Sequence, residues 1–102
     1  MRHKFNAKPT VFNDTRYASR LEAKYAQRLN TAKDRGELLF WLEQVPFRLP
    51  GQIKYVVDFV EFWANSDIVF SECKGFETPE WKLKYKLFIE TYSFITLNIV
   101  KK

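Results

Sequence analysis

The chain has 102 residues, of which 46% are hydrophobic and 18% are aromatic. This length provides for one domain with one core and leaves no space for a second domain. A single cysteine excludes an internal disulfide, and together with a single histidine it argues against a Cys/His zinc site. The apolar runs are far shorter than the roughly 18 residues of a membrane span, and the first residues do not resemble a signal peptide. We therefore expect a cytoplasmic protein that does not bind a membrane.

The formal net charge is +5, and it is unevenly distributed. Residues 1–36 contain nine Lys and Arg against three acids, a balance of +6, whereas residues 37–102 contain eight against nine, a balance of −1. A basic first third beside a centre of carboxylates suits a nuclease, in which basic flanks hold phosphates and acids hold a metal ion. The alternative is that the basic side chains only solvate the surface.

The first half of the chain predicts an arm, a helix and a long strand. Residues 1–13 form a basic N-terminal arm, and a single domain follows over residues 14–102. Asp14 or Thr15 is expected to cap a helix that runs to about Ala32. Residues 38–49 are strand-like, and Pro46 within them predicts an edge strand or a bulge.

The second half predicts a hairpin, a helix and a final strand. Residues 54–62 and 68–74 are two strands joined by a turn at residues 65–67. Thr78, Pro79 and Glu80 are typical of a helix start, and this helix is expected to end near residue 92. Residues 95–99 alternate between apolar and polar and predict a strand. The expected order is α-β-β-β-α-β, an α/β fold.

The stretch Glu72-Cys73-Lys74 is the most informative part of the sequence. A hairpin folded about residue 65 places position 58 opposite position 72. Alternate side chains of a strand share a face, so Glu72 and Lys74 point together and Cys73 points away. Two carboxylates, from Asp58 and Glu72, and one lysine are therefore expected on one face of a sheet, where a bound cation would neutralise the acids.

This arrangement resembles the active site of the PD-(D/E)XK nucleases, with Asp58 as the Asp of the first motif and Glu72 and Lys74 as the E-x-K of the second. The ordered set of a helix Glu, a strand Asp, E-x-K, a G-F-x-T segment at residues 75–78 and a basic helix is similar to the small phage and prophage endonucleases related to Holliday-junction resolvases. The resemblance runs from about Phe12 to Val100. It implies a restriction-endonuclease-like core, in which helices flank a central mixed sheet. One departure is Val57, where many members have a proline before the Asp.

The resemblance implies catalytic roles for Asp58, Glu72, Lys74 and Glu22. It implies one or two Mg²⁺ ions, for which Mn²⁺ would substitute, held by Asp58, Glu72, Glu22 and the backbone carbonyl of Cys73. Lys74 would orient the attacking water and stabilise charge on the phosphate. The residues leave alternatives open: Asp58 at an edge or paired with Lys74, and Glu22 as an exposed helix residue. Gln44 either contacts a phosphate or the metal-bound water, or satisfies backbone groups near Pro46.

Two groups of basic residues are candidates for binding nucleic acid. Lys82 and Lys86 lie one turn apart on the second helix, and Lys84 is turned away from them. The other group is expected along the first helix and comprises Arg16, Arg20, Lys24 and Arg28. Like charges spaced i, i+4 slightly destabilise a helix, which favours a polyanionic partner. A solvated helix face is the alternative for both groups.

These observations predict a Mg²⁺-dependent DNA endonuclease that acts on branched or recombination-intermediate DNA of a phage, in the cytoplasm of the bacterial host. A homodimer is a further expectation, because cutting both strands of a junction needs two sites. The alternative is a non-catalytic nucleic-acid-binding phage protein on a nuclease-like fold, which would need the basic residues but not Asp58, Glu72 and Lys74 on one face.

Overall fold

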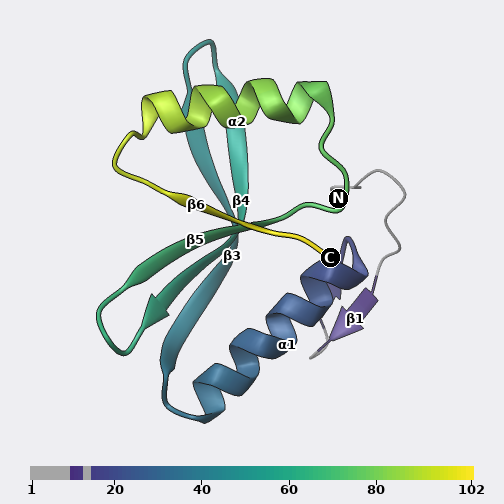
Figure 1. Cartoon of the computed structure of the whole chain (residues 1–102), viewed down its shortest axis with the longest axis vertical. Coiled ribbons are helices and arrows are strands. Elements are labelled where there is room, and N and C mark those ends of the chain that lie inside the picture. Colours follow the sequence, from purple (N-terminus) through teal and green to yellow (C-terminus); the bar gives the residue numbers. More distant parts are fainter. Residues whose placement is uncertain (1–9, 13–14) are drawn as a thin grey trace.

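The computed structural model describes residues 10–12 and 15–102, which form an α/β fold (Figure 1). In chain order its elements are β1 (Thr10–Phe12), β2 (Thr15–Tyr17), α1 (Arg20–Asp34), β3 (Leu38–Leu49), β4 (Ile53–Trp63), β5 (Ile68–Cys73), α2 (Pro79–Thr91) and β6 (Leu97–Val100). Neither helix in these ranges has the length and apolar character needed to cross a membrane.

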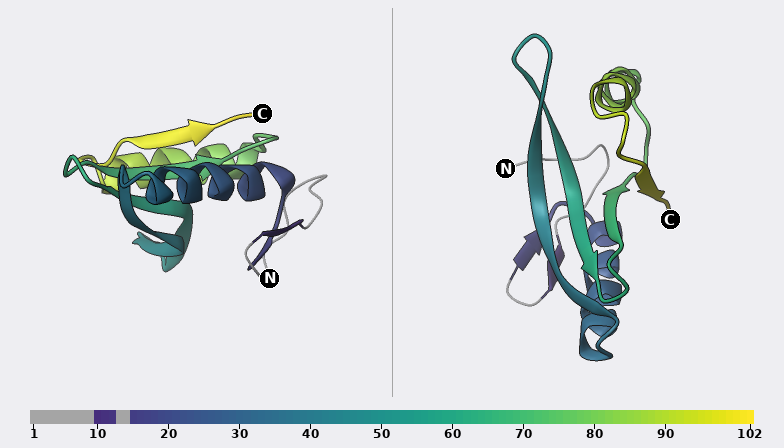
Figure 2. Two further views of the ribbon diagram at one scale, coloured as in Figure 1. Left: turned by 90° about the horizontal axis from the view of Figure 1, so that it is seen from below. Right: turned by 90° about the vertical axis from the view of Figure 1, so that its left-hand side faces the viewer.

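Four strands form a mixed sheet in the order β3-β4-β5-β6. The pairs β3–β4 and β4–β5 are antiparallel, and β5–β6 is parallel across the connection that contains α2. In Figure 1, α2 lies above and α1 below the crossing strands β5 and β6. Figure 2 shows the long β3–β4 hairpin standing to one side of both helices. The predicted α/β fold with a mixed sheet and two helices is confirmed.

The strand and helix predictions after residue 37 agree with the structure to within one or two residues; the last strand, predicted over residues 95–99, is β6 at Leu97–Val100. β3 is an edge strand of the four-stranded sheet, as Pro46 predicted, because an edge tolerates a residue without an N–H. At the hairpin turn that follows, Gly51 and Gln52 have φ of 78° and 61°. α2 begins after Thr78, whose side chain accepts the Trp81 N–H at 3.1 Å. For β3 and for the start of α2, the local sequence signals and the folded structure therefore agree.

The first helix starts later than the sequence predicted. Thr15 does not cap it; Thr15–Tyr17 is strand β2, paired with β1. α1 begins at Arg20, because the Ser19 side chain accepts the Glu22 N–H at 3.2 Å and caps the first turn. Residues 10–12, expected in the arm, form β1. Asp14 and residues 1–9 lie outside the described ranges.

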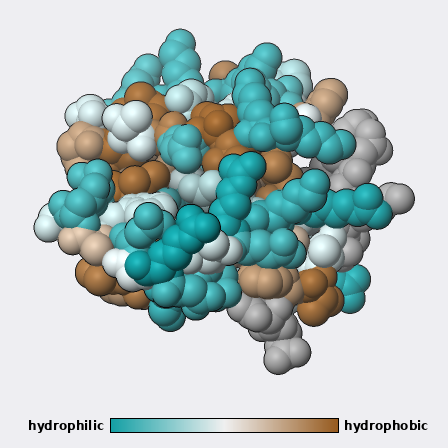
Figure 3. Space-filling view, turned by 60° about the horizontal axis from the view of Figure 1, so that its bottom comes forward, coloured by the Kyte–Doolittle hydropathy of each residue, from teal (hydrophilic) through white to brown (hydrophobic). Residues whose placement is uncertain are grey.

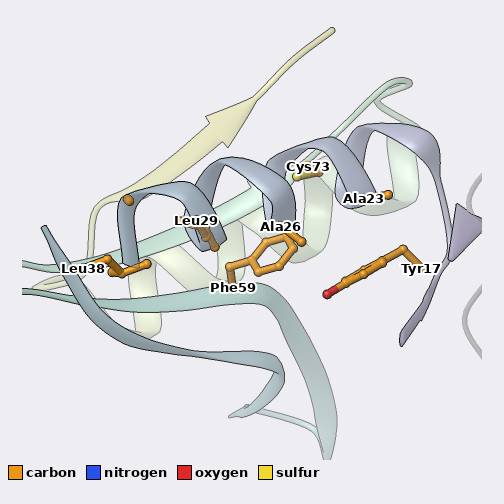
Figure 4. Close-up of a cluster of buried hydrophobic side chains, with 8 residues drawn as sticks. Tyr17, Ala23, Ala26, Leu29, Leu38, Phe59 and Cys73 are labelled. Carbon is orange, nitrogen blue, oxygen red and sulfur yellow. The ribbon is translucent and has the colours of Figure 1, made fainter. Parts of the chain in front are cut away.

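Two clusters of buried side chains form the core. The first lies between α1 and the sheet, where Ala23, Ala26 and Leu29 pack against Phe59 and Cys73 (Figure 4). The second lies under α2 and comprises Leu49, Tyr55, Val57, Val60, Phe88, Ile95 and Leu97. Trp81, Tyr85 and Tyr92 are half-buried and pack against this second cluster. The sheet thus carries a core on each side, and the candidate site lies where the two cores meet.

Candidate active site

The β4–β5 hairpin has the register that the sequence predicted. Val60 pairs with Phe70 and Phe59 with Ser71, so the next position places Asp58 opposite Glu72. The ladder of paired residues ends at Phe59 and Ser71. Beyond it, the Asp58 N–H donates to Glu72 Oε1 at 3.2 Å, and the Cys73 N–H donates to Asp58 Oδ2 at 2.9 Å. The two carboxylates therefore accept backbone N–H groups at the point where the strands stop pairing with each other.

Asp58 and Glu72 are 0% and 1% exposed, and Lys74 lies beside them. Lys74 Nζ is 3.6 Å from Glu72 Oε2 and 5.0 Å from the centre of the Trp81 ring. The Lys74 side chain is 13% exposed. Because Trp81 is on the first turn of α2, this helix helps to hold the ammonium group beside Glu72. The hairpin thus brings the predicted Asp, Glu and Lys together.

Gln44 approaches the same carboxylate from β3. Its Nε2 donates to Asp58 Oδ1 at 3.2 Å, so Asp58 accepts hydrogen bonds on both oxygens. The Gln44 backbone has φ of 53°, the left-handed region, within a strand. The bond from the Gln44 amide to Asp58 is a contact that neither sequence-based alternative foresaw, and the strand register around Gln44 is unbroken. Contact of Gln44 with a phosphate or a metal-bound water stays a prediction.

Glu22 is buried rather than exposed. It is 1% exposed on the first turn of α1, which packs against the sheet. Its charge contributes to a raised pKa of Tyr17, after the larger effects of burial and of Glu43. Its role as a third metal ligand stays a prediction. The Cys73 side chain, expected to point away from Glu72, lies in the core under α1.

The donor set fits a magnesium ion better than a metal that needs many protein ligands. In the ranges 10–12 and 15–102, no three His, Cys, Asp and Glu side chains form a group that could hold a metal ion. Mg²⁺, however, commonly binds proteins through one or two carboxylates and keeps several waters. Asp58 and Glu72 supply carboxylate oxygens from adjacent strands. Their chemistry fits this mode of binding.

The basic residues predicted to bind nucleic acid lie on three elements, β2, α1 and α2. Arg20, Lys24 and Arg28 are exposed along one strip of α1, whereas Arg16 lies on β2, so the predicted helical pair of Arg16 and Arg20 is wrong. On α2, Lys82 and Lys86 are exposed. Lys84 lies 3.7 Å from Glu80 in an i, i+4 ion pair. The face that carries α1 shows hydrophilic side chains spread between smaller hydrophobic patches (Figure 3).

The segment between β5 and α2 is tied to the end of the chain. Lys101 Nζ lies 2.9 Å from Glu77 Oε2, and this hydrogen bond holds the pKa of Glu77 below its usual value. Lys82 and Lys74 lower the pKa of Glu77 further through their charges. Glu77, within the predicted G-F-x-T segment, therefore lies close to three lysines.

Sequence reasoning missed two further acids, Glu61 and Glu43, on the side of the sheet that faces α1. Glu61 is 1% exposed and accepts hydrogen bonds from Tyr25 Oη at 2.7 Å and Trp63 Nε1 at 3.0 Å. Glu43 accepts from Tyr17 Oη at 2.6 Å and Trp41 Nε1 at 2.9 Å. Burial, more than these acids, raises the pKa of both tyrosines above the ordinary value. The sequence signal that could have found these acids is a tryptophan two positions from a glutamate, at residues 41–43 and 61–63. Alternate residues of a strand share a face, so each such pair can form a hydrogen bond.

The family model described as "Protein of unknown function (DUF1064)" matches residues 2–102, nearly the whole chain. No curated protein matches the chain.

Proposed function

This chain belongs to the DUF1064 family of proteins of unknown function, and from its site we propose that it is a metal-dependent deoxyribonuclease of the PD-(D/E)XK type. One observation carries the proposal: Asp58 and Glu72 are both fully buried on adjacent strands, and Lys74 lies 3.6 Å from Glu72. Burying an ionised carboxylate costs several kcal/mol unless it is compensated. As a set, these three side chains bear one net negative charge, which attracts a divalent cation.

Asp58 and Glu72 would hold Mg²⁺ or Mn²⁺, with the Cys73 carbonyl and Glu22 as further candidate ligands. When bound, such an ion polarises a phosphate and lowers the pKa of a bound water. The protein's own contribution is orientation and charge. The Cys73 N–H fixes the Asp58 carboxylate, and the contact with Trp81 fixes the Lys74 ammonium. A cation held in this way stabilises negative charge that develops on a phosphate in the transition state.

The exposed basic residues support DNA as the substrate. Arg20, Lys24 and Arg28 follow one strip of α1, and Lys82 and Lys86 lie on α2, the helix whose Trp81 contacts Lys74. Such side chains contact phosphates rather than base edges, so we propose that shape is recognised more than sequence. Branched phage DNA, such as a junction or flap, offers phosphates in more than one direction. A homodimer would set two such surfaces at a fixed angle.

The test is a cleavage assay on labelled junction, flap and duplex of equal length, at one stated salt concentration, with Mg²⁺, Mn²⁺ or EDTA. We expect cleavage with either metal ion and none with EDTA. Asp58→Ala and Glu72→Ala should abolish cleavage and retain DNA binding, because they leave the basic surface unchanged. Lys84→Ala is the matched control, since Lys84 pairs with Glu80. With cleavage blocked by Ca²⁺, the junction should compete best.

Two outcomes would overturn the proposal. Cleavage by either Ala variant at more than a few per cent of the normal rate would refute the site. DNA binding without cleavage under any metal condition would leave the non-catalytic nucleic-acid-binding protein as the function. That alternative is supported by the exposed basic residues of α1 and α2, which would bind DNA without the buried acids.

A further inference from the structure

Gln44 has an unusual backbone conformation for its position. It lies inside β3 with φ of 53°, where a residue with a Cβ atom is strained and a glycine is not. The register is the same on both sides of it, with Glu43 opposite Phe59 and Val45 opposite Val57. No residue is inserted, so the conformation does not come from a bulge. Strain of this kind persists only where the surrounding structure enforces it.

The Gln44 side chain shows what this conformation achieves. Its amide reaches Asp58 Oδ1 at 3.2 Å. Because an ionised carboxylate only accepts hydrogen bonds, the group that contacts Asp58 must be the NH₂ of the amide. The Cys73 N–H occupies the other oxygen, Oδ2, at 2.9 Å. Two donors on two different oxygens fix the plane of the carboxylate.

We infer that Gln44 is a positioning residue, which orients the Asp58 carboxylate for a divalent cation by means of its left-handed backbone. A glycine at position 44 would remove the strain but has no amide to offer. The inference rests on the proposed function, because it needs Asp58 to be a metal ligand. Partners that orient a metal ligand typically change metal affinity about 10- to 100-fold when they are removed.

The experiment measures Mn²⁺ affinity of the full-length protein without DNA, by the electron paramagnetic resonance signal of free Mn²⁺, together with thermal unfolding in EDTA. The variants are Gln44→Ala, which loses the amide and keeps the strain, and Gln44→Gly, which loses both. Gln52→Gly is the matched control, because Gln52 has a similar φ of 61° at the β3–β4 turn. Gln52→Gly removes strain at a position outside the site.

We expect Gln44→Gly to unfold at a higher temperature than Gln44→Ala, and both to bind Mn²⁺ about 10- to 100-fold more weakly than the wild type. Gln52→Gly should bind Mn²⁺ as the wild type does. Saturating Mn²⁺ should restore most of the cleavage rate of Gln44→Gly, because the variant changes the binding of the ion rather than the chemical step.

A purely structural role predicts a different result. If Gln44→Gly bound Mn²⁺ within twofold of the wild type, or more tightly, the inference would be refuted and the proposed function would stand. If the wild type itself bound no Mn²⁺ at millimolar concentration, the metal-dependent function would fail, and the inference with it.

Discussion

Replacing Tyr25 with phenylalanine removes one hydroxyl from the buried polar group that joins α1 to the sheet. Tyr25 Oη donates to Glu61 Oε2 at 2.7 Å and lies 3.1 Å from Ser71 Oγ. Phenylalanine keeps the ring contact with Phe59, whose centroid is 5.2 Å from that of Tyr25. The variant therefore tests the hydroxyl alone.

The expected cost follows from the burial of Glu61. A hydrogen bond to a charged group contributes about 1.5–3 kcal/mol, and a buried acceptor that loses its donor costs at least as much. Because Glu61 is almost fully buried, water does not replace the hydroxyl, and we expect the free energy of unfolding to fall by about 3 kcal/mol. Tyr17→Phe makes the same change beside Glu43, which is half-buried. Water can reach that acceptor, so we expect a loss of about 1 kcal/mol.

Urea unfolding at pH 7, followed by tryptophan fluorescence, measures both variants. A double-mutant cycle of Tyr25→Phe with Glu61→Gln isolates the contribution of the contact itself. Equal losses for Tyr17→Phe and Tyr25→Phe would refute the reasoning, because burial of the acceptor would then not decide the cost. A coupling energy near zero in the cycle would show that Glu61 does not depend on Tyr25.

Two further predictions concern the lysines and pH. Lys74→Ala should slow single-turnover cleavage with little change in DNA affinity. Lys82→Ala combined with Lys86→Ala should instead weaken DNA binding and reduce the dependence of log affinity on log salt concentration by roughly one to two. An unchanged salt dependence would exclude α2 as a phosphate contact. Burial raises the pKa of Tyr17 and Tyr25, so the folded state favours their protonated forms. The stability that this protonation contributes is complete below about pH 10, the ordinary pKa of tyrosine, and is lost as the pH rises above it. Urea unfolding between pH 8 and 11 should show a steeper decline for the wild type than for Tyr25→Phe, and parallel declines would contradict this.

The sequence predicted the β4–β5 hairpin and its register because the signals are local. A polar turn centred on residue 65 and the twofold alternation of a strand together determine which residues face each other. The apposition of Asp58 and Glu72 followed from counting along the chain. The same holds for α2, since Thr78 and Pro79 mark its start.

The predicted start of α1 was wrong because two local signals compete in this part of the sequence. Thr15 and Asp14 are good capping residues, and Tyr17 fits the apolar spacing of the helix. Strand β2 takes residues 15–17 instead, since β1 pairs with it. Ser19, three residues before Glu22, is the cap that the structure uses, and this spacing is a recognised start signal that could have been preferred.

The site residues that the sequence did not determine depend on contacts between distant segments. Tyr25 and Glu61 are 36 positions apart, and their contact requires α1 to lie against β4. The left-handed conformation of Gln44 has no sequence signal, because glutamine is not a residue that favours it. Such features come from packing, and only a structure shows them.

The position of the acids explains how the fold tolerates them. Before Asp58 along β4, Tyr55 and Val57 belong to the core under α2; after it, Phe59 belongs to the core under α1. The β4–β5 ladder ends between these cores, and the N–H groups of Asp58 and Cys73 turn to carboxylates. Backbone donors that would be orphaned at the end of the ladder thus meet acceptors that would be costly to bury alone. The backbone N–H groups and the carboxylates thus satisfy each other's hydrogen bonds, and two buried acids can persist side by side in a small domain. Their negative charge is the charge that a cation would need.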